Sequence, residues 1–164
     1  WQDLLCEIVK ILSVLHSDKI ICVFQLSFLK KGFRSGSACA GIENAKGDGF
    51  VTTLFGRRRY LPELSSSNGM LRAFGERVAR NMPIQGTAAD IIKLAMVNVD
   101  RRLAKEKLRT RLILQVHDEL IVECPKEIAQ QVAALISRKM EEVAQLNVPL
   151  LAEAKWGTSW YEAK

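Results

Sequence analysis

The sequence contains few of the residues from which zinc centres and disulfide frameworks are built. Its four cysteines form no C-x-x-C pair, and its two histidines, His16 and His117, stand far apart in the chain. A zinc centre needs closely spaced ligands and a disulfide framework needs a regular cysteine pattern, so neither is indicated. We therefore expect the protein in a reducing compartment.

A long apolar run is also lacking. In the apolar N-terminal segment the longest uncharged stretch, residues 20–29, is too short to cross a bilayer. The chain has no positively charged start followed by an apolar core and a small-residue cleavage site, so no signal peptide is indicated. These absences predict that the protein has no membrane partner.

The composition that is present is that of a globular domain. The chain has 164 residues, of which 48% are hydrophobic and 26% charged, which is enough for one domain with a buried core. Its net charge of +6 and its pI near 9.3 favour a polyanionic partner. Modest basicity is also common in proteins that bind no polyanion, so the charge alone leaves both possibilities open.

An acidic turn is predicted within residues 112–123. Two apolar runs flank His117, Asp118 and Glu119, a pattern typical of a strand, a tight turn and a returning strand. Carboxylates at the ends of buried strands are costly unless a cation meets them, which favours a metal ion. The alternative is an exposed turn that happens to be acidic.

Three consecutive arginines, Arg57, Arg58 and Arg59, follow a predicted strand at residues 50–55 and a turn at Gly56. Such a run is often a solvated surface. Arginine is also the side chain best suited to bidentate phosphate binding, so a nucleic-acid contact is the second interpretation.

A polar stripe is predicted on a helix that begins after N-cap candidates at residues 65–68. Arg77, Asn81 and Gln85 recur every four residues, so they share one face if the helix continues through Pro83, where a kink is expected. These side chains can donate hydrogen bonds to acceptors in a nucleic-acid groove. An ordinary solvated helix face is the alternative.

The remaining apolar patterns predict the rest of the secondary structure. Small residues at 86–89 would permit close approach of another element to the helix that carries them. The predicted elements are helices at 1–15, from 85 onward and at 125–146, strands at 20–29 and 148–154, and a linker at 32–38.

Three ordered blocks of the sequence resemble the C-terminal portion of family A DNA polymerases, most closely those of the bacterial polymerase I type. The blocks are residues 48–62 (DGFVTTLFGRRRYLP), residues 76–90, which contain QGTAAD, and residues 115–120 (QVHDEL). Several blocks at family spacing are more specific than any single motif. The resemblance covers residues 42–164.

The resemblance implies roles for the acidic turn. Asp118 resembles the motif C aspartate that binds catalytic Mg²⁺ in the palm, with Glu119 as a supporting neighbour and second candidate ligand. His117 resembles the histidine that lies near the primer terminus. These three residues would form the catalytic part of the site, and His117 would also contact DNA.

The resemblance also implies a DNA contact. Arg77, Asn81 and Gln85 are similar to the family's trio at the primer–template minor groove, and the arginines at 57–59 to its basic segment on the nucleic-acid backbone. Primer–template DNA and deoxynucleoside triphosphates are the implied partners of the full-length parent, and nothing indicates an obligate protein partner. A cytoplasmic, nucleoid-associated location follows.

The implied fold is α+β: part of a polymerase palm, whose antiparallel strands include the motif C hairpin, with adjoining fingers helices. The family's motif A and the fingers helix that meets the incoming triphosphate are not found, and both should lie upstream of Ile42. Residues 1–41 show no family resemblance and are kept apart from residues 42–164. The hypotheses for them are a frameshifted, truncated or recombined reading frame and a divergent N-terminus.

The implied function is template-directed nucleotidyl transfer by two metal ions, in DNA replication or repair. Because motif A and the fingers helix are missing, the chain alone is expected to be inactive. Two alternatives remain open: a non-catalytic remnant that still binds DNA, and a truncated product that folds poorly.

Overall fold

The computed structural model describes residues 18–28, 36–147 and 149–163. The predicted helix at 1–15 lies outside these residues, and so does the first part of the predicted linker. The chain divides into two compact units, the first formed by residues 1–29 and 92–164 and the second by residues 30–91. No helix in the described part of the chain is long and apolar enough to cross a membrane.

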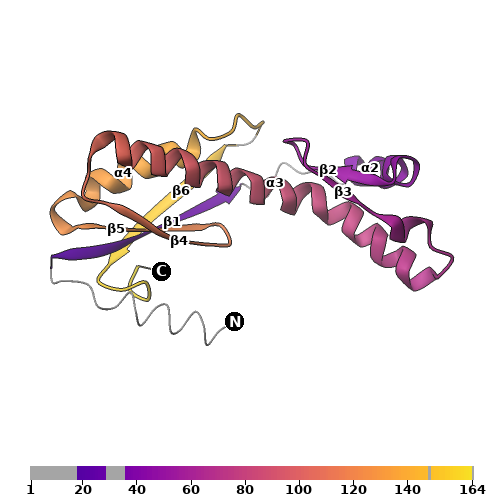
Figure 1. Ribbon diagram of the computed structural model, residues 1–164, viewed down its shortest axis with the longest axis horizontal. Coiled ribbons are helices and arrows are strands. Elements are labelled where there is room, and N and C mark those ends of the chain that lie inside the picture. Colours follow the sequence, from indigo (N-terminus) through magenta and orange to yellow (C-terminus); the bar gives the residue numbers. More distant parts are fainter. Residues whose placement is uncertain (1–17, 29–35, 148, 164) are drawn as a thin grey trace. The chain divides into compact units, whose positions relative to one another are not determined.

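The first unit is built on a four-stranded antiparallel sheet (Figure 1). Its order is β4-β5-β1-β6, so β1 lies between β5 and β6. The predicted strand at 20–29 is confirmed, and the predicted closing strand begins slightly later, after Pro149, which has no amide hydrogen for a ladder. The strands are β1 (Lys19–Phe28), β4 (Arg111–Val116), β5 (Glu119–Pro125) and β6 (Leu150–Gly157).

Helix α4 (Ala129–Glu141) packs on this sheet against β6 and β1 (Figure 1). Its buried side chains include Val132, Ile136 and Met140, which recur at helical spacing as predicted. The helix is shorter than the predicted 125–146, because β5 continues to Pro125 and a 3₁₀ turn (Lys126–Ile128) follows. The predicted α+β class with an antiparallel sheet is confirmed.

The second unit holds a short antiparallel hairpin packed between helical segments. A small core of Ala45, Val51, Leu61, Leu64, Ala79 and Met82 joins them, and Lys46 Nζ pairs with Glu76 Oε1 at 2.9 Å. The predicted linker is wrong from residue 36 onward, because a helix begins there. The elements are α2 (Gly36–Asp48), β2 (Phe50–Thr52), β3 (Arg58–Tyr60), η2 (Pro62–Ser65) and the first part of α3 (Gly69–Glu106).

Helix α3 is one continuous helix of 38 residues that contributes to both units. Asn68 caps it, since its Oδ1 accepts a hydrogen bond of 2.9 Å from the Met70 amide. The sequence predicted a separate helix from residue 85, which is wrong. A proline inside a helix costs about 3 kcal/mol, and the helix continues because it buries apolar side chains on both sides of Pro83, among them Met82 and Ile91.

Candidate metal and nucleic-acid site

The acidic turn is a two-residue hairpin connection. Val116 of β4 pairs with Glu119 of β5, which leaves His117 and Asp118 as the loop. His117 has a φ of 52°, the left-handed conformation that two-residue hairpin loops require at their first position. The Gln115 side-chain amide donates to the His117 carbonyl oxygen at 2.7 Å. The predicted strand, turn and returning strand are confirmed.

The two carboxylates of the turn differ in burial. Asp118 is exposed, whereas Glu119 is only 9% exposed. Asp118 belongs to the loop and Glu119 begins β5, so only the Asp118 carboxylate is presented to solvent. The strand β1 fixes the backbone here, because the Leu26 amide donates to the Asp118 carbonyl oxygen at 3.0 Å and Gln25 pairs with Glu119.

The donor set at the turn suits a loosely held Mg²⁺ ion. Within the described residues, no group of three or more His, Cys, Asp or Glu side chains is placed to hold a metal. Mg²⁺ accepts hard oxygen ligands and keeps several waters, so it can bind through one or two carboxylates. Asp118 is the accessible carboxylate of the turn. Glu119, the predicted second ligand, is buried and therefore not accessible from solvent.

A hollow of about 740 Å³ in the second unit, called the basic groove here, brings the other predicted residues together. The β2–β3 hairpin forms one part of its lining and α3 the other, with Phe74, Val78 and Met82 as apolar wall. Its six predicted polar residues, all exposed, are Arg57, Arg58, Arg59, Arg77, Asn81 and Gln85. The predicted polar stripe on the helix is confirmed.

Arg57 fastens the hairpin to α3. Its Nε donates to Asp90 Oδ1 at 2.8 Å and its Nη2 to the Gly86 carbonyl oxygen at 3.0 Å. A Cβ on Gly86 would come within 2.7 Å of Thr53 Cγ2, so the close approach requires glycine there. Because its guanidinium is engaged within the protein, Arg57 has less capacity for a ligand than its two neighbours.

Aromatic rings hold two of the other arginines in place. The Arg58 guanidinium lies 4.7 Å from the centre of the Phe50 ring, and that of Arg77 lies 5.9 Å from the centre of the Phe74 ring. Such cation–π contacts orient the side chain and leave its N–H donors available. The sequence reasoning missed Phe74, although its position three residues before Arg77 places both on one helix face.

Thr87 gives the hairpin a second attachment to α3. Its hydroxyl accepts a hydrogen bond of 2.9 Å from the Leu54 amide and donates to the Pro83 carbonyl oxygen at 2.5 Å. This residue was also missed, because nothing in a helical Thr signals a partner distant in sequence.

The hydrogen bond from Lys46 and its positive charge lower the pKa of Glu76, which therefore stays ionised beside Arg77.

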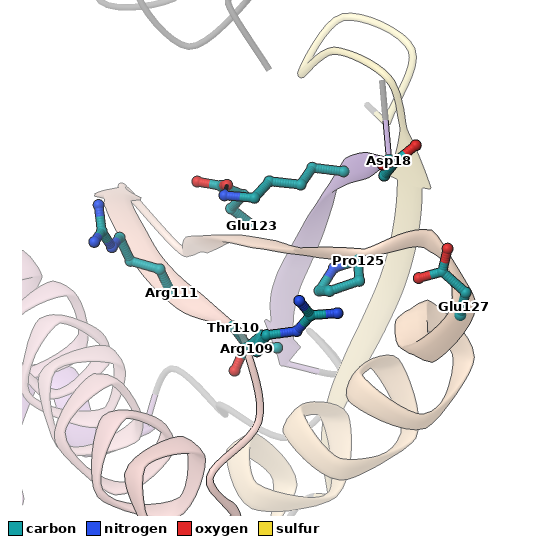
Figure 2. A pocket seen from close by; sticks show the side chains of 8 residues that line it. Asp18, Arg109, Thr110, Arg111, Glu123, Pro125 and Glu127 are labelled. Carbon is teal, nitrogen blue, oxygen red and sulfur yellow. Dashed lines mark ion pairs between the residues drawn. The ribbon is translucent and has the colours of Figure 1, made fainter. Parts of the chain in front are cut away.

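A cleft of about 710 Å³ in the first unit holds none of the predicted site residues (Figure 2). Arg109 and Arg111 flank Thr110 there, and Lys19 forms an ion pair with Glu123. The cleft is lined by three cationic side chains (Lys19, Arg109, Arg111) and three acidic ones (Asp18, Glu123, Glu127). Because these charges balance, the cleft does not favour a polyanion as the basic groove does.

Comparisons with known proteins agree with these features. The family described as DNA polymerase family A matches residues 38–162. The chain is 51% identical over 123 residues to DNA polymerase I of Bacillus caldotenax, covering 75% of this chain and 14% of that protein. It is 55% identical over 116 residues to DNA polymerase I of Deinococcus radiodurans, covering 71% and 12%.

A solved structure agrees as well. The POL domain of Pol1 from M. smegmatis, in complex with DNA primer-template and dNTP, superposes with a TM-score of 0.74 at 45% identity. The match covers 77% of this chain and 22% of that one, and the chain spans about 14% of the length of the first polymerase I relative. These matches show that the chain, which carries the acidic hairpin turn and the basic groove, belongs to DNA polymerase family A.

Proposed function

We propose that this chain is a piece of a polymerase I-type polymerase domain that binds primer–template DNA through the basic groove. The observation that carries the proposal is the groove itself, where six residues singled out in the sequence line one hollow of about 740 Å³. In this proposal the antiparallel strands are part of the palm, and the helices of the second unit are the adjoining helices of the fingers.

The two parts of the groove would do different work on DNA. Arg58 and Arg59 would hold phosphate oxygens, contacts that position a duplex without reading its sequence. Asn81 and Gln85 would donate hydrogen bonds to minor-groove acceptors, which occupy similar places in every correct base pair. The groove would therefore sense the shape of the duplex at the primer end rather than its sequence.

The hairpin turn would supply the metal-binding carboxylate. We propose Asp118 as the ligand of Mg²⁺, with Glu119 supporting the turn and His117 lying near the primer terminus. The bound metal would activate the primer 3′ hydroxyl and neutralise developing negative charge. The contribution of this chain is to present an exposed carboxylate on a backbone that β1 and Gln115 hold in place.

The chain alone is proposed to be catalytically incomplete. Two-metal chemistry needs carboxylates that converge from separate strands, and β1, the neighbour of β5, contains no acidic residue. Nucleotidyl transfer, triphosphate binding and a cytoplasmic, nucleoid-associated location are proposed for the whole protein. The division into residues 1–41 and 42–164 is retained as a proposal, with β1 on the N-terminal side.

One observation favours the alternative of a truncated product that folds poorly. Several large apolar side chains are exposed close together at the start of α3, including Met70 at 84%, Leu71 at 48% and Phe74 at 42%. Contiguous exposed apolar surface normally marks a face that another segment covers. A single cooperative thermal transition would support the folded, DNA-binding chain, and a broad transition without a baseline would support the alternative.

We expect Gln85→Ala to weaken binding at a primer–template junction about 5-fold, since losing one hydrogen bond costs about 1 kcal/mol. Binding to uniform duplex should weaken less, because phosphate contacts dominate there. Fluorescence anisotropy with labelled DNA measures both affinities. Gln130→Ala, an equally exposed glutamine on α4, is the matched control and should change neither. Equal loss on both DNAs would remove the minor-groove assignment.

A further inference from the structure

Two buried thiols lie side by side in the sheet of the first unit. Cys22 of β1 and Cys124 of β5 have Sγ atoms 3.5 Å apart, and both residues are completely buried. In the register of the strands, Cys22 pairs with Val122 and Ile20 with Cys124, so both thiols lie on the same face of the sheet. Both are free thiols.

The two thiols are chemically unequal. The hydrogen bond between the two thiols and burial raise the pKa of Cys22, whereas the same hydrogen bond lowers the pKa of Cys124. The thiolate is the reactive form of cysteine. Because the two Sγ atoms lie 3.5 Å apart, a thiol oxidised first is within reach of the other, and the lowered pKa of Cys124 favours it as the attacking sulfur.

We propose that Cys22 and Cys124 form an oxidative modification site, at which a peroxide converts the dithiol into a disulfide that ties β1 to β5. Cys124 attacks a peroxide oxygen, forming an S–O bond as the O–O bond breaks and water leaves. Cys22 then attacks that sulfur, forming the S–S bond as the S–O bond breaks and a second water leaves. Two electrons pass from the thiols to hydrogen peroxide, which is reduced to water.

The position of the pair determines the consequence. The cross-link joins residues 102 positions apart in the sequence and so restricts the unfolded chain strongly. It fixes β1 against the strand that leads out of the acidic turn, where the Leu26 amide already binds the Asp118 carbonyl oxygen. Because both thiols are buried, a peroxide reaches them when the sheet opens locally, and low urea should accelerate the reaction.

The test uses the full chain with Cys6→Ser and Cys39→Ser, so that the two remaining thiols are the pair. After treatment with hydrogen peroxide, the intact mass should fall by two hydrogens, and peptide mapping should find Cys22 joined to Cys124. The midpoint of thermal unfolding should rise by about 10 °C. Dithiothreitol should reverse both changes, and adding Cys124→Ser to this background should abolish them.

Three results would overturn the proposal. They are retention of both thiols, measured by titration in denaturant; gain of oxygen atoms without a cross-link; and cross-links between chains instead of within one. If the variant with Cys6→Ser and Cys39→Ser fails to fold, peptide mapping of the peroxide-treated chain without substitutions decides the question. A Cys22–Cys124 peptide there supports the site, and its absence contradicts it.

Discussion

Incubation of the purified chain with a primed template, Mg²⁺ and deoxynucleoside triphosphates is expected to yield no extended primer. The accessible carboxylate of the turn is Asp118 alone, since Glu119 is 9% exposed. Two-metal catalysis needs several carboxylates held at one point. The described residues contain no group of three or more His, Cys, Asp or Glu side chains placed to hold a metal ion. Primer extension should therefore be absent rather than slow.

The control is a full-length family A polymerase on the same substrate, assayed by gel separation of the extended primer. DNA binding by the chain is measured in the same sample, so that failure to extend is not confused with failure to bind. Primer extension by the chain that Asp118→Asn abolishes would contradict the proposed incompleteness and assign activity to the turn itself.

Phe24→Ala is expected to remove about 3–5 kcal/mol from the free energy of unfolding, the usual cost of truncating a large buried aromatic side chain. Phe24 is completely buried on β1, where it pairs with Leu120 of β5 and Ala154 of β6. A loss of this size is a large fraction of the stability of an ordinary domain. Urea denaturation followed by circular dichroism measures it.

Gln25→Ala is the matched control, because this neighbouring side chain is exposed on the same strand. Its effect should stay within about 0.5 kcal/mol. Similar small effects for both variants would mean that β1 does not form part of the folded sheet. The experiment therefore tests a strand that lies outside the residues 38–162 matched by the family.

The acidic turn and the polar stripe could be predicted because their patterns are local. Apolar runs on either side of His117 and Asp118 predict a hairpin from local sequence alone, and a repeat of four places Arg77, Asn81 and Gln85 on one face of any helix. The structure adds how the stripe meets the hairpin. Both the Gly86 contact and the Thr87 hydrogen bond join α3 to residues more than thirty positions away.

Other features depended on long-range packing that local sequence does not contain. The sequence predicted a new helix from residue 85, just after Pro83, yet burial on both sides of the proline keeps α3 continuous. The neighbouring acids Asp118 and Glu119 look equivalent in sequence, but pairing of Glu119 with Val116 and Gln25 buries that residue. The central position of β1 likewise required partners that follow it by about a hundred residues.

The basic groove gathers several cationic side chains of the second unit in one hollow. The described residues that line the hollow with Arg58, Arg59 and Arg77 include no acidic side chain, and Arg57 is paired with Asp90. A duplex placed there would meet the guanidinium groups of Arg58 and Arg77, which aromatic rings hold in place. It would also meet the side-chain amides of Asn81 and Gln85, which lie four residues apart on α3. In the proposed function, this arrangement holds phosphate by charge and contacts the minor groove by hydrogen bonding.

Arginine footprinting tests the DNA-binding account most directly. The chain is treated with phenylglyoxal, with and without primer–template DNA, and the modification of each arginine is measured by mass spectrometry. DNA should protect Arg58, Arg59 and Arg77, while the exposed Arg101 and Arg138 of the first unit react as before. Equal modification of all five in both samples, or protection of Arg101 and Arg138 alone, would contradict binding through the basic groove.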